Sequence, residues 1–135
     1  MTVPPIRVSE LDLQRLESLL AAMAHLPAEL ELLQAELERA EILPAQQMPA
    51  QVVTMNSRVR FRLASSQKEF DKVLCYPKDE SLSPDHLSVF APMGSALLGL
   101  AAGQSIVWPL PNGQQTEVCI LEVLYQPEAA GDWHR

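Results

Sequence analysis

The chain has few of the residues that mark specialised protein classes. Of its 135 residues only two are cysteines, Cys75 and Cys119, which are too few for a disulfide framework and lack the spacing of a zinc site. Both thiols are therefore predicted to be reduced, small core residues of a cytoplasmic protein. Three scattered histidines provide no metal-ligand spacing either, so we expect no metal and no cofactor.

The sequence also lacks long apolar runs and a surplus of basic residues. No stretch approaches the roughly 20 apolar residues of a membrane span, and the first residues, MTVPPIRVSELDLQ, lack the basic start and apolar run of a secretory signal. Ten Lys and Arg against 17 Asp and Glu give a net charge of −7. This charge argues against attachment to anionic membranes and against a basic footprint on nucleic acid. We therefore expect no membrane partner and no direct, sequence-specific nucleic-acid contact.

Residues 1–44 are predicted to form a helical hairpin. Ser9 followed by Asp12 resembles a capping box, and two apolar stripes with helical spacing follow it, interrupted by Pro27. The stripes consist of Leu13, Leu16, Leu20 and Met23, then Leu26, Leu30, Leu33, Leu37 and Ala40. Each helix would span about 15 residues, or ~22 Å. The pattern favours a projecting antiparallel two-helix coiled coil; the alternative is a hairpin that is part of a globular core.

A linker is predicted at residues 45–51, because Pro44 should end the second helix and is followed by polar and small residues and a second proline, Pro49. Residues 52–135 are predicted to form a separate α+β domain of mostly antiparallel sheet with one short helix. Asn112-Gly113 between two apolar runs is typical of a β-hairpin. The expected strands are 52–55, 58–63, 68–76, 86–90, 104–110 and 115–125, with the helix after Pro92 and irregular chain at 77–85 and 126–135.

Alternation within residues 58–63 places three arginines, Arg58, Arg60 and Arg62, on one face of a strand. Such a face suits a phosphate or an acidic partner. The alternative is a solvated sheet face whose arginines pair across strands with acidic residues, namely Glu69, Asp71 or Glu122. Nothing in the chain supplies a base, a nucleophile and an orienting group together, so we predict no catalytic residue and no enzyme.

A resemblance to a known family rests on four segments of the sequence. They are AELERAEILPAQQMPAQVVTMNSRVRF, LSVFAPMGSALLGLAAGQSIVWPLPNG, LEVLYQP and EAAGDW. Together these segments resemble the Rnk family, the regulators of nucleoside diphosphate kinase, within the GreA/GreB superfamily of transcription elongation factors. The resemblance implies an N-terminal coiled coil joined to an FKBP-like domain without prolyl isomerase activity. It also implies binding to RNA polymerase at the secondary channel, in competition with Gre factors. We expect a monomer when the protein is free.

The resemblance places the polymerase contact just before the short helix. Gre factors carry an Asp-Ser-Pro segment there, and the matching positions in this chain are Phe90, Ala91 and Pro92, followed by Met93. Proline is kept, whereas apolar residues replace Asp and Ser. Phe90 is expected to be either a buried interface anchor or an ordinary core residue.

The hairpin tip differs from that of Gre factors, whose tip acids help to hold a magnesium ion for transcript cleavage. The tip in this chain contains His25, Leu26 and Pro27, and Glu29 is the nearest acid. With short arms and no acidic tip, we expect a non-catalytic regulator that occupies the channel without stimulating cleavage. The alternative is a regulator that acts directly on nucleoside diphosphate kinase or another cytoplasmic enzyme.

Overall fold

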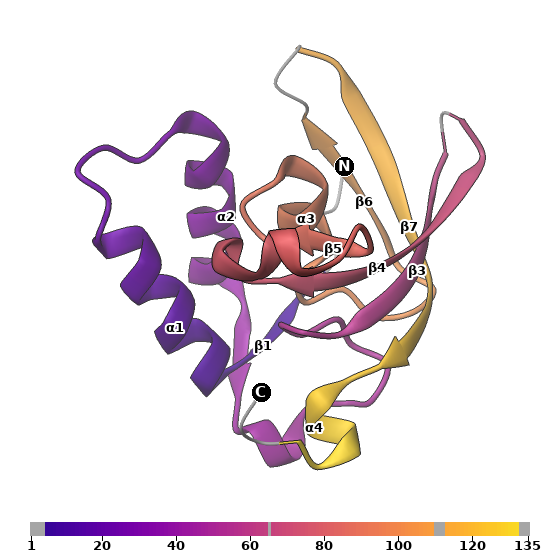
Figure 1. The fold of residues 1–135 in the computed structure, drawn as a ribbon, viewed down its shortest axis with the longest axis horizontal. Helices are drawn as coiled ribbons and strands as arrows, with labels where there is room; N and C mark the ends of the chain where they lie inside the picture. Colours follow the sequence, from indigo (N-terminus) through magenta and orange to yellow (C-terminus); the bar gives the residue numbers. More distant parts are fainter. Residues whose placement is uncertain (1–4, 65, 110–112, 133–135) are drawn as a thin grey trace.

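The protein consists of a helical hairpin packed beside a curled five-stranded sheet (Figure 1). It was studied as a computed structural model, which describes residues 5–64, 66–109 and 113–132. The elements in chain order are β1 (Arg7–Ser9), α1 (Glu10–Ala21), α2 (Ala28–Arg39), β2 (Glu41–Leu43), the 3₁₀ helix η1 (Ala45–Gln47), β3 (Arg58–Leu63), β4 (Lys68–Cys75), the 3₁₀ helix η2 (Pro77–Leu82), β5 (His86–Ser88), α3 (Pro92–Leu97), β6 (Ser105–Pro109), β7 (Gln115–Tyr125) and α4 (Pro127–Ala130).

The predicted hairpin is present, with helices shorter than expected. Ser9 caps α1, because its hydroxyl accepts a hydrogen bond from the Asp12 amide at 3.1 Å, as the capping motif predicts. Each helix has 12 residues, because Met23 and Leu26 lie in the connection and Ala40 follows the end of α2. These strands, β1 and β2, pair in parallel, with Arg7 opposite Glu41 and a 3.0 Å ion pair between the two side chains. This pair of strands, which the sequence patterns do not predict, holds the two ends of the hairpin together.

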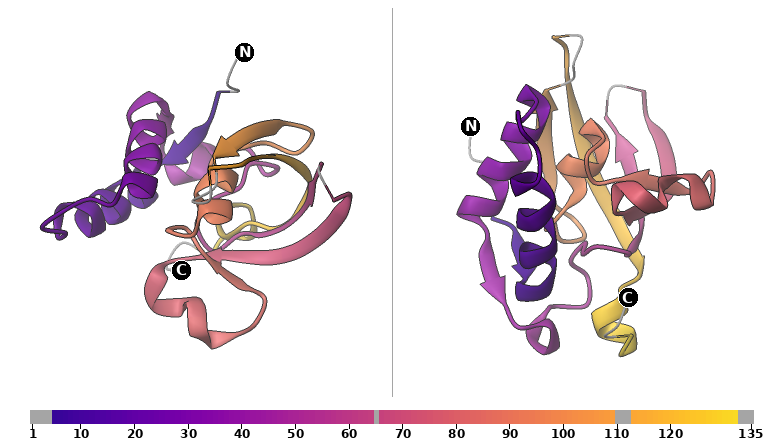
Figure 2. Two further views of the ribbon diagram at one scale, coloured as in Figure 1. Left: turned by 90° about the horizontal axis from the view of Figure 1, so that it is seen from above. Right: turned by 60° about the vertical axis from the view of Figure 1, so that its left-hand side comes forward.

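The main sheet has the order β5-β4-β3-β7-β6. All of its neighbours are antiparallel except β4 and β5, which are parallel. The predicted alternation in β3 is confirmed, since Val59 and Phe61 are buried while Arg60 is exposed. The pairing of β3 with β7 shifts register at two places, and such irregularities bend a strand. The sheet consequently curls around α3, which lies on its concave side (Figure 2).

One hydrophobic core joins the hairpin to the sheet. Phe61 and Leu97 from the sheet domain and Leu16 and Leu33 from the hairpin belong to the same cluster of buried side chains. Helix α2 contacts α3, so the hairpin packs against the sheet domain, and the buried leucines of both helices belong to the shared cluster. The connection between α1 and α2 lies at the end of the hairpin that is farthest from β1 (Figure 1).

Several segments differ from the sequence-based expectations. Residues 52–55 are not a strand: Val52 makes one isolated bridge to Ala101, and the next residues turn where the Ser57 hydroxyl accepts a hydrogen bond from the Thr54 amide. Much of the loop expected at 77–85 is the 3₁₀ helix η2, and the tail expected to be irregular contains α4. The Asn112 turn lies outside the described residues, although the strands that it joins are confirmed as β6 and β7.

The segment predicted as a linker is held by side-chain hydrogen bonds. The Gln126 amide group donates to the carbonyl oxygens of Pro49 at 2.7 Å and Val52 at 2.8 Å. Gln51 both donates to and accepts from the backbone of Val123, each at 3.2 Å. These bonds satisfy buried backbone groups that no strand pairs, and they hold residues 45–51 against the C-terminal end of β7.

Gly94 permits the close packing of α3 on the end of β5. A Cβ atom at this position would lie 2.0 Å from the Ser88 carbonyl oxygen, which belongs to the backbone and cannot turn aside.

We predict that Gly94→Ala lowers the free energy of unfolding by about 3 kcal/mol or more, measured by urea denaturation. Gly103→Ala is the matched control, because Gly103 has a φ of +89° but no atom within 4 Å of a Cβ. It should cost only about 1 kcal/mol, and equal losses would contradict the packing explanation.

Candidate functional site

The segment predicted to contact polymerase forms the entry to α3. Ser88 at the end of β5 fixes it, because its hydroxyl accepts a hydrogen bond from the Phe90 amide at 3.0 Å and its carbonyl accepts one from the Ala91 amide. Phe90, Ala91, Pro92 and Met93 are all partly exposed, while the residues on either side of the segment are buried. The result is a small, mainly apolar surface with a fixed backbone.

The hairpin tip forms a second, separate group of predicted residues. Pro27 precedes α2, and its carbonyl oxygen accepts the first bonds of the helix from the amides of Leu30 and Glu31. His25 and Pro27 are exposed, whereas Leu26 is partly buried against the core. Glu29 lies in the first turn of α2. The tip between α1 and α2 thus presents an imidazole and a proline ring, and residues 22–28 contain no acid.

The two predicted groups lie on different elements that share one core. Phe90 and Met93 pack against the core from the α3 side, and Leu26 packs against it from the hairpin side. Because α2 contacts α3 directly, the orientation of the hairpin relative to the segment at 90–93 is fixed by packing. A partner that touches both groups therefore meets them in a fixed relative placement.

A buried carboxylate, which sequence reasoning missed, joins the hairpin to the sheet domain. Asp12 in the first turn of α1 is 4% exposed. Its Oδ2 accepts a hydrogen bond from the Met55 amide at 3.1 Å, and its Oδ1 accepts one from the Tyr76 hydroxyl at 3.4 Å. The capping motif at Ser9 indicated where α1 begins, but no local pattern could indicate that this carboxylate reaches residues 43 and 64 positions away.

Burial raises the pKa of Asp12 to about 6 from its ordinary value of 3.8. The Met55 amide and the charge of Arg15 act in the opposite direction, whereas the nearby charge of Glu128 raises the pKa further. Burial is the largest cause because a carboxylate loses its hydration in the contact. Burial likewise raises the pKa of Tyr76.

Helix α4 extends this polar contact toward the C-terminus. The Thr54 hydroxyl donates to Oε1 of Glu128 at 2.7 Å and lies 2.8 Å from the Ser57 hydroxyl oxygen. The side chain of Gln126 caps α4 by accepting a hydrogen bond from the Ala129 amide. A helix in the expected irregular tail therefore carries a carboxylate toward the joint between hairpin and sheet.

The arginine face of β3 is partly paired across strands. Arg58 forms ion pairs with Asp71 at 2.6 Å and Asp85 at 3.6 Å, and the hydrogen bond to Asp71 raises the pKa of the guanidinium. This pairing agrees with the solvated-face alternative at Arg58. Arg60 is exposed, and Nε of Arg62 is buried without a hydrogen-bond partner among the described residues.

Within residues 5–64, 66–109 and 113–132, no group of three His, Cys, Asp or Glu side chains is arranged to hold a metal ion. In the same part of the chain, no helix is long and apolar enough to cross a membrane. The distinctive features of the described structure are instead the rigid surface at 90–93 and the polar joint at Asp12.

Comparisons with known proteins cover both parts of the chain. Residues 48–125 match the family described as transcription elongation factor, GreA/GreB, C-term, and residues 4–43 match the Rnk N-terminus family. A solved structure described as prokaryotic transcription elongation factor GreA/GreB from Nitrosomonas europaea is 49% identical, with a TM-score of 0.71 over 90% of this chain and 99% of that one. The fold is therefore that of a GreA/GreB-like factor.

Curated relatives narrow this class further. The chain is 47% identical over 135 residues to the regulator of nucleoside diphosphate kinase of Escherichia coli (strain K12), covering 98% of both proteins. It is 31% identical over 90 residues to transcription elongation factor GreA of Helicobacter hepaticus, covering 67% of this chain and 55% of that protein. The chain belongs to the Rnk family of GreA/GreB-like proteins, as the four sequence segments indicated.

The raised pKa of Asp12 predicts a specific pH dependence of stability. Because the pKa is about 6 in the folded state and 3.8 ordinarily, the folded protein holds this proton more tightly than the unfolded chain does. The associated stabilisation is complete below pH ~4 and is lost as the pH rises through about 6, a change of about 3 kcal/mol. Asp12→Asn should therefore gain about 3 kcal/mol relative to wild type between pH 4 and pH 7.

Urea denaturation of both proteins at several pH values measures this difference. Glu10→Gln is the matched control, because Glu10 is an exposed acid in the same first turn of α1. Its stability should follow the wild-type pH profile. A constant difference between Asp12→Asn and wild type from pH 4 to pH 7 would contradict the assignment.

Proposed function

We propose that this protein is a non-catalytic regulator of transcription that binds RNA polymerase at the secondary channel and competes there with Gre factors. Membership of the Rnk family and the match to the GreA/GreB C-terminal family over residues 48–125 carry the proposal. In this role the sheet domain, FKBP-like in the expected fold, docks at the channel rim. The hairpin acts as a short coiled coil directed into the channel.

The surface at 90–93 supports this docking mode. Phe90 and Met93 are partly exposed and pack against the core on their inner side, so an incoming partner would bury the remainder. Apolar side chains held on a fixed backbone lose little conformational entropy on binding, which favours them as interface anchors. The hydrogen bonds that Ser88 accepts from the Phe90 and Ala91 amides provide that fixed backbone.

The hairpin geometry supports occupancy without transcript cleavage. Each arm has 12 residues, which corresponds to about 18 Å of helix. The connection of residues 22–27 presents His25 and Pro27 to solvent and contains no carboxylate for a magnesium ion. Both helices also belong to the shared core along their length, from Leu16 to Leu20 and from Leu30 to Leu37, so neither arm is free to project as a whole.

A direct action on nucleoside diphosphate kinase is the second candidate function. The observation that favours it is the description of the Escherichia coli relative as a regulator of that kinase. Control of kinase expression through transcription would satisfy the same description. A pull-down with purified kinase and with purified polymerase, each as the single bait, separates the two functions.

The first functional prediction concerns polymerase binding. The purified protein should bind bacterial core RNA polymerase and be displaced by a Gre factor in a fluorescence competition assay. Phe90→Ala should weaken binding by about 1–3 kcal/mol because it removes an anchor side chain. Leu124→Ala is the control, since Leu124 is an exposed apolar residue near the end of β7 and lies outside the segment at 90–93. Absence of any binding by wild type would refute the proposal, and unchanged binding by Phe90→Ala would assign Phe90 to the core alone.

The second functional prediction concerns cleavage. Stalled elongation complexes incubated with this protein and magnesium should show no transcript shortening above the intrinsic rate, because the tip brings no carboxylate. Added Gre factor should cleave, and increasing amounts of this protein should suppress that cleavage. Transcript cleavage above the intrinsic rate with this protein alone would contradict the prediction.

A further inference from the structure

The turn at residues 54–57 is held by two carboxylates that come from opposite ends of the chain. Oδ2 of Asp12, in the first turn of α1, accepts a hydrogen bond from the Met55 amide at 3.1 Å. Oε1 of Glu128, in α4, accepts one from the Thr54 hydroxyl at 2.7 Å. Because Thr54 and Met55 are adjacent residues, the hairpin and the C-terminal helix are bonded to the same turn of backbone.

The turn itself is buried and internally bonded. Thr54, Met55 and Ser57 are each no more than 1% exposed. The Ser57 hydroxyl oxygen accepts a hydrogen bond from the Thr54 amide at 2.9 Å and lies 2.8 Å from the Thr54 hydroxyl oxygen. Since Thr54 donates its hydroxyl hydrogen to Glu128, Ser57 donates to Thr54. A carboxylate that leaves the turn therefore leaves behind a buried donor, which is costly.

Two like charges face each other across this turn. Burial is the largest cause of the raised pKa of Asp12, and the charge of Glu128 on α4 raises the pKa further. Arg15 faces Asp12 from α1 and lowers the pKa, and the Tyr76 hydroxyl faces it from the end of β4. Ionised Asp12 therefore repels α4 through Glu128, whereas neutral Asp12 does not.

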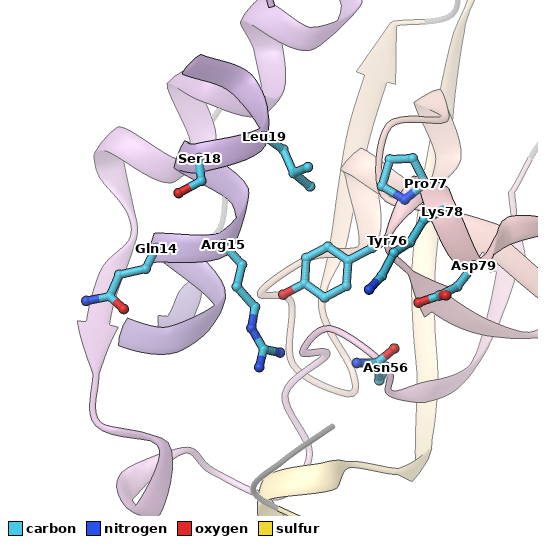
Figure 3. Close-up of a pocket in the computed structure, with 9 residues that line it drawn as sticks. All are labelled: Gln14, Arg15, Ser18, Leu19, Asn56, Tyr76, Pro77, Lys78 and Asp79. Carbon is cyan, nitrogen blue, oxygen red and sulfur yellow. The ribbon is translucent and has the colours of Figure 1, made fainter. Parts of the chain in front are cut away.

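The position of Arg15 limits how far it can neutralise this repulsion. In Figure 3 its side chain extends from α1 toward the hydroxyl end of Tyr76. Both residues line an open cleft of about 910 Å³ between α1 and η2, and water in such a cleft screens a charge. Glu128 reaches the turn from the other side, through Thr54. The cation and the second carboxylate thus act on Asp12 from different directions.

Helix α4 is the element that can respond to the charge on Asp12. It has four residues, Pro127–Ala130, and its main contacts with another helix are those with η1. Gln126 holds the start of α4 through hydrogen bonds to the carbonyl oxygens of Pro49 and Val52, so the last turn depends more on the bond made by Glu128. Short terminal elements with few buried contacts open locally at low free-energy cost.

We propose that the turn at 54–57 couples the two ends of the chain, so that the charge on Asp12 controls how tightly the C-terminal helix α4 is docked. With neutral Asp12, Glu128 docks on Thr54 without opposition; with ionised Asp12, the two carboxylates repel and α4 loosens. A proton on Oδ1 of Asp12 leaves the bond from the Met55 amide to Oδ2 in place, so α1 stays attached in both forms. Coupling between two sites is reciprocal, and docked α4 therefore favours the neutral form of Asp12.

This coupling goes beyond the proposed function, because it lies within the protein and needs no partner. Its midpoint is set by the pKa of Asp12, about 6. The C-terminal helix should therefore be held more tightly in mildly acidic than in neutral solution.

Removal of the charge at Glu128 tests the coupling at Asp12. NMR follows the titration of the Asp12 carboxyl carbon in wild type and in Glu128→Gln, which keeps an acceptor for Thr54. We expect the midpoint to fall by about half a pH unit in the variant. Thr54→Val, which removes the donor to Glu128, should also lower it. Thr116→Val is the matched control, because Thr116 is likewise buried but its hydroxyl has no hydrogen-bond partner among the described residues, and its midpoint should equal that of wild type.

Amide hydrogen exchange in α4 tests the reciprocal effect. The amides of residues 129–131 donate the hydrogen bonds that close this helix. Their protection is compared at pH 5 and pH 7.5, after correction for the intrinsic exchange rate. Half a pH unit corresponds to about threefold, so the protection in wild type should fall about threefold between these pH values. It should stay constant in Asp12→Asn, whereas Glu10→Gln, the exposed acid in the same turn of α1, should follow wild type.

The two measurements separate coupling from a merely structural role of Glu128. A structural role would lower the protection of α4 equally at both pH values and leave the Asp12 midpoint unchanged in Glu128→Gln, and this result would overturn the proposal. Protection that is constant with pH in wild type, or that falls equally in Asp12→Asn, would overturn it too. Neither measurement contains RNA polymerase, so a failure of the proposed function would leave these outcomes unaffected.

Discussion

The packing of α3 inside the curled sheet is the constraint on which the rest of the structure depends. Gly94 allows the helix to approach the carbonyl of Ser88 so closely that no side chain fits between them. That approach fixes the entry to α3 as a partly exposed surface, and it places the other side of α3 against α2. The position of the hairpin is thus a consequence of how one short helix is seated in the sheet.

The second contact between hairpin and sheet is the polar one at Asp12, and the desolvation of its carboxylate opposes folding. Asp12 receives hydrogen bonds from Met55 and Tyr76, but its burial disfavours the ionised form that these donors satisfy. A hydrophobic contact would hold α1 in place without a preferred direction, whereas two directed hydrogen bonds also define how the helix is rotated. The orientation of α1 matters because residues of α1 and Tyr76 together line an open cleft between the hairpin and the sheet domain.

Local sequence patterns predicted most of the fold. The two leucine stripes identified the hairpin, alternation in β3 identified its buried face, and Pro92 marked the start of α3. Patterns failed where long-range contacts decide the structure. Val52 to Met55 have the composition of a strand. In the structure, however, the Gln126 amide group donates to the Val52 carbonyl, and the Ser57 hydroxyl accepts a hydrogen bond from the Thr54 amide. The segment at 90–93 came from family resemblance, whereas the Asp12 joint and the cleft depend on residues far apart in the chain and have no local signature.

The parallel pairing of β1 and β2 brings the two ends of the hairpin side by side, with Arg7 opposite Glu41. The hairpin is therefore a closed excursion from the body of the protein, much as a hairpin loop leaves and re-enters an RNA stem. Adding or removing whole helical turns at its far end would leave the paired base and the shared core unchanged. The length of the hairpin can therefore change in evolution independently of how the sheet domain folds.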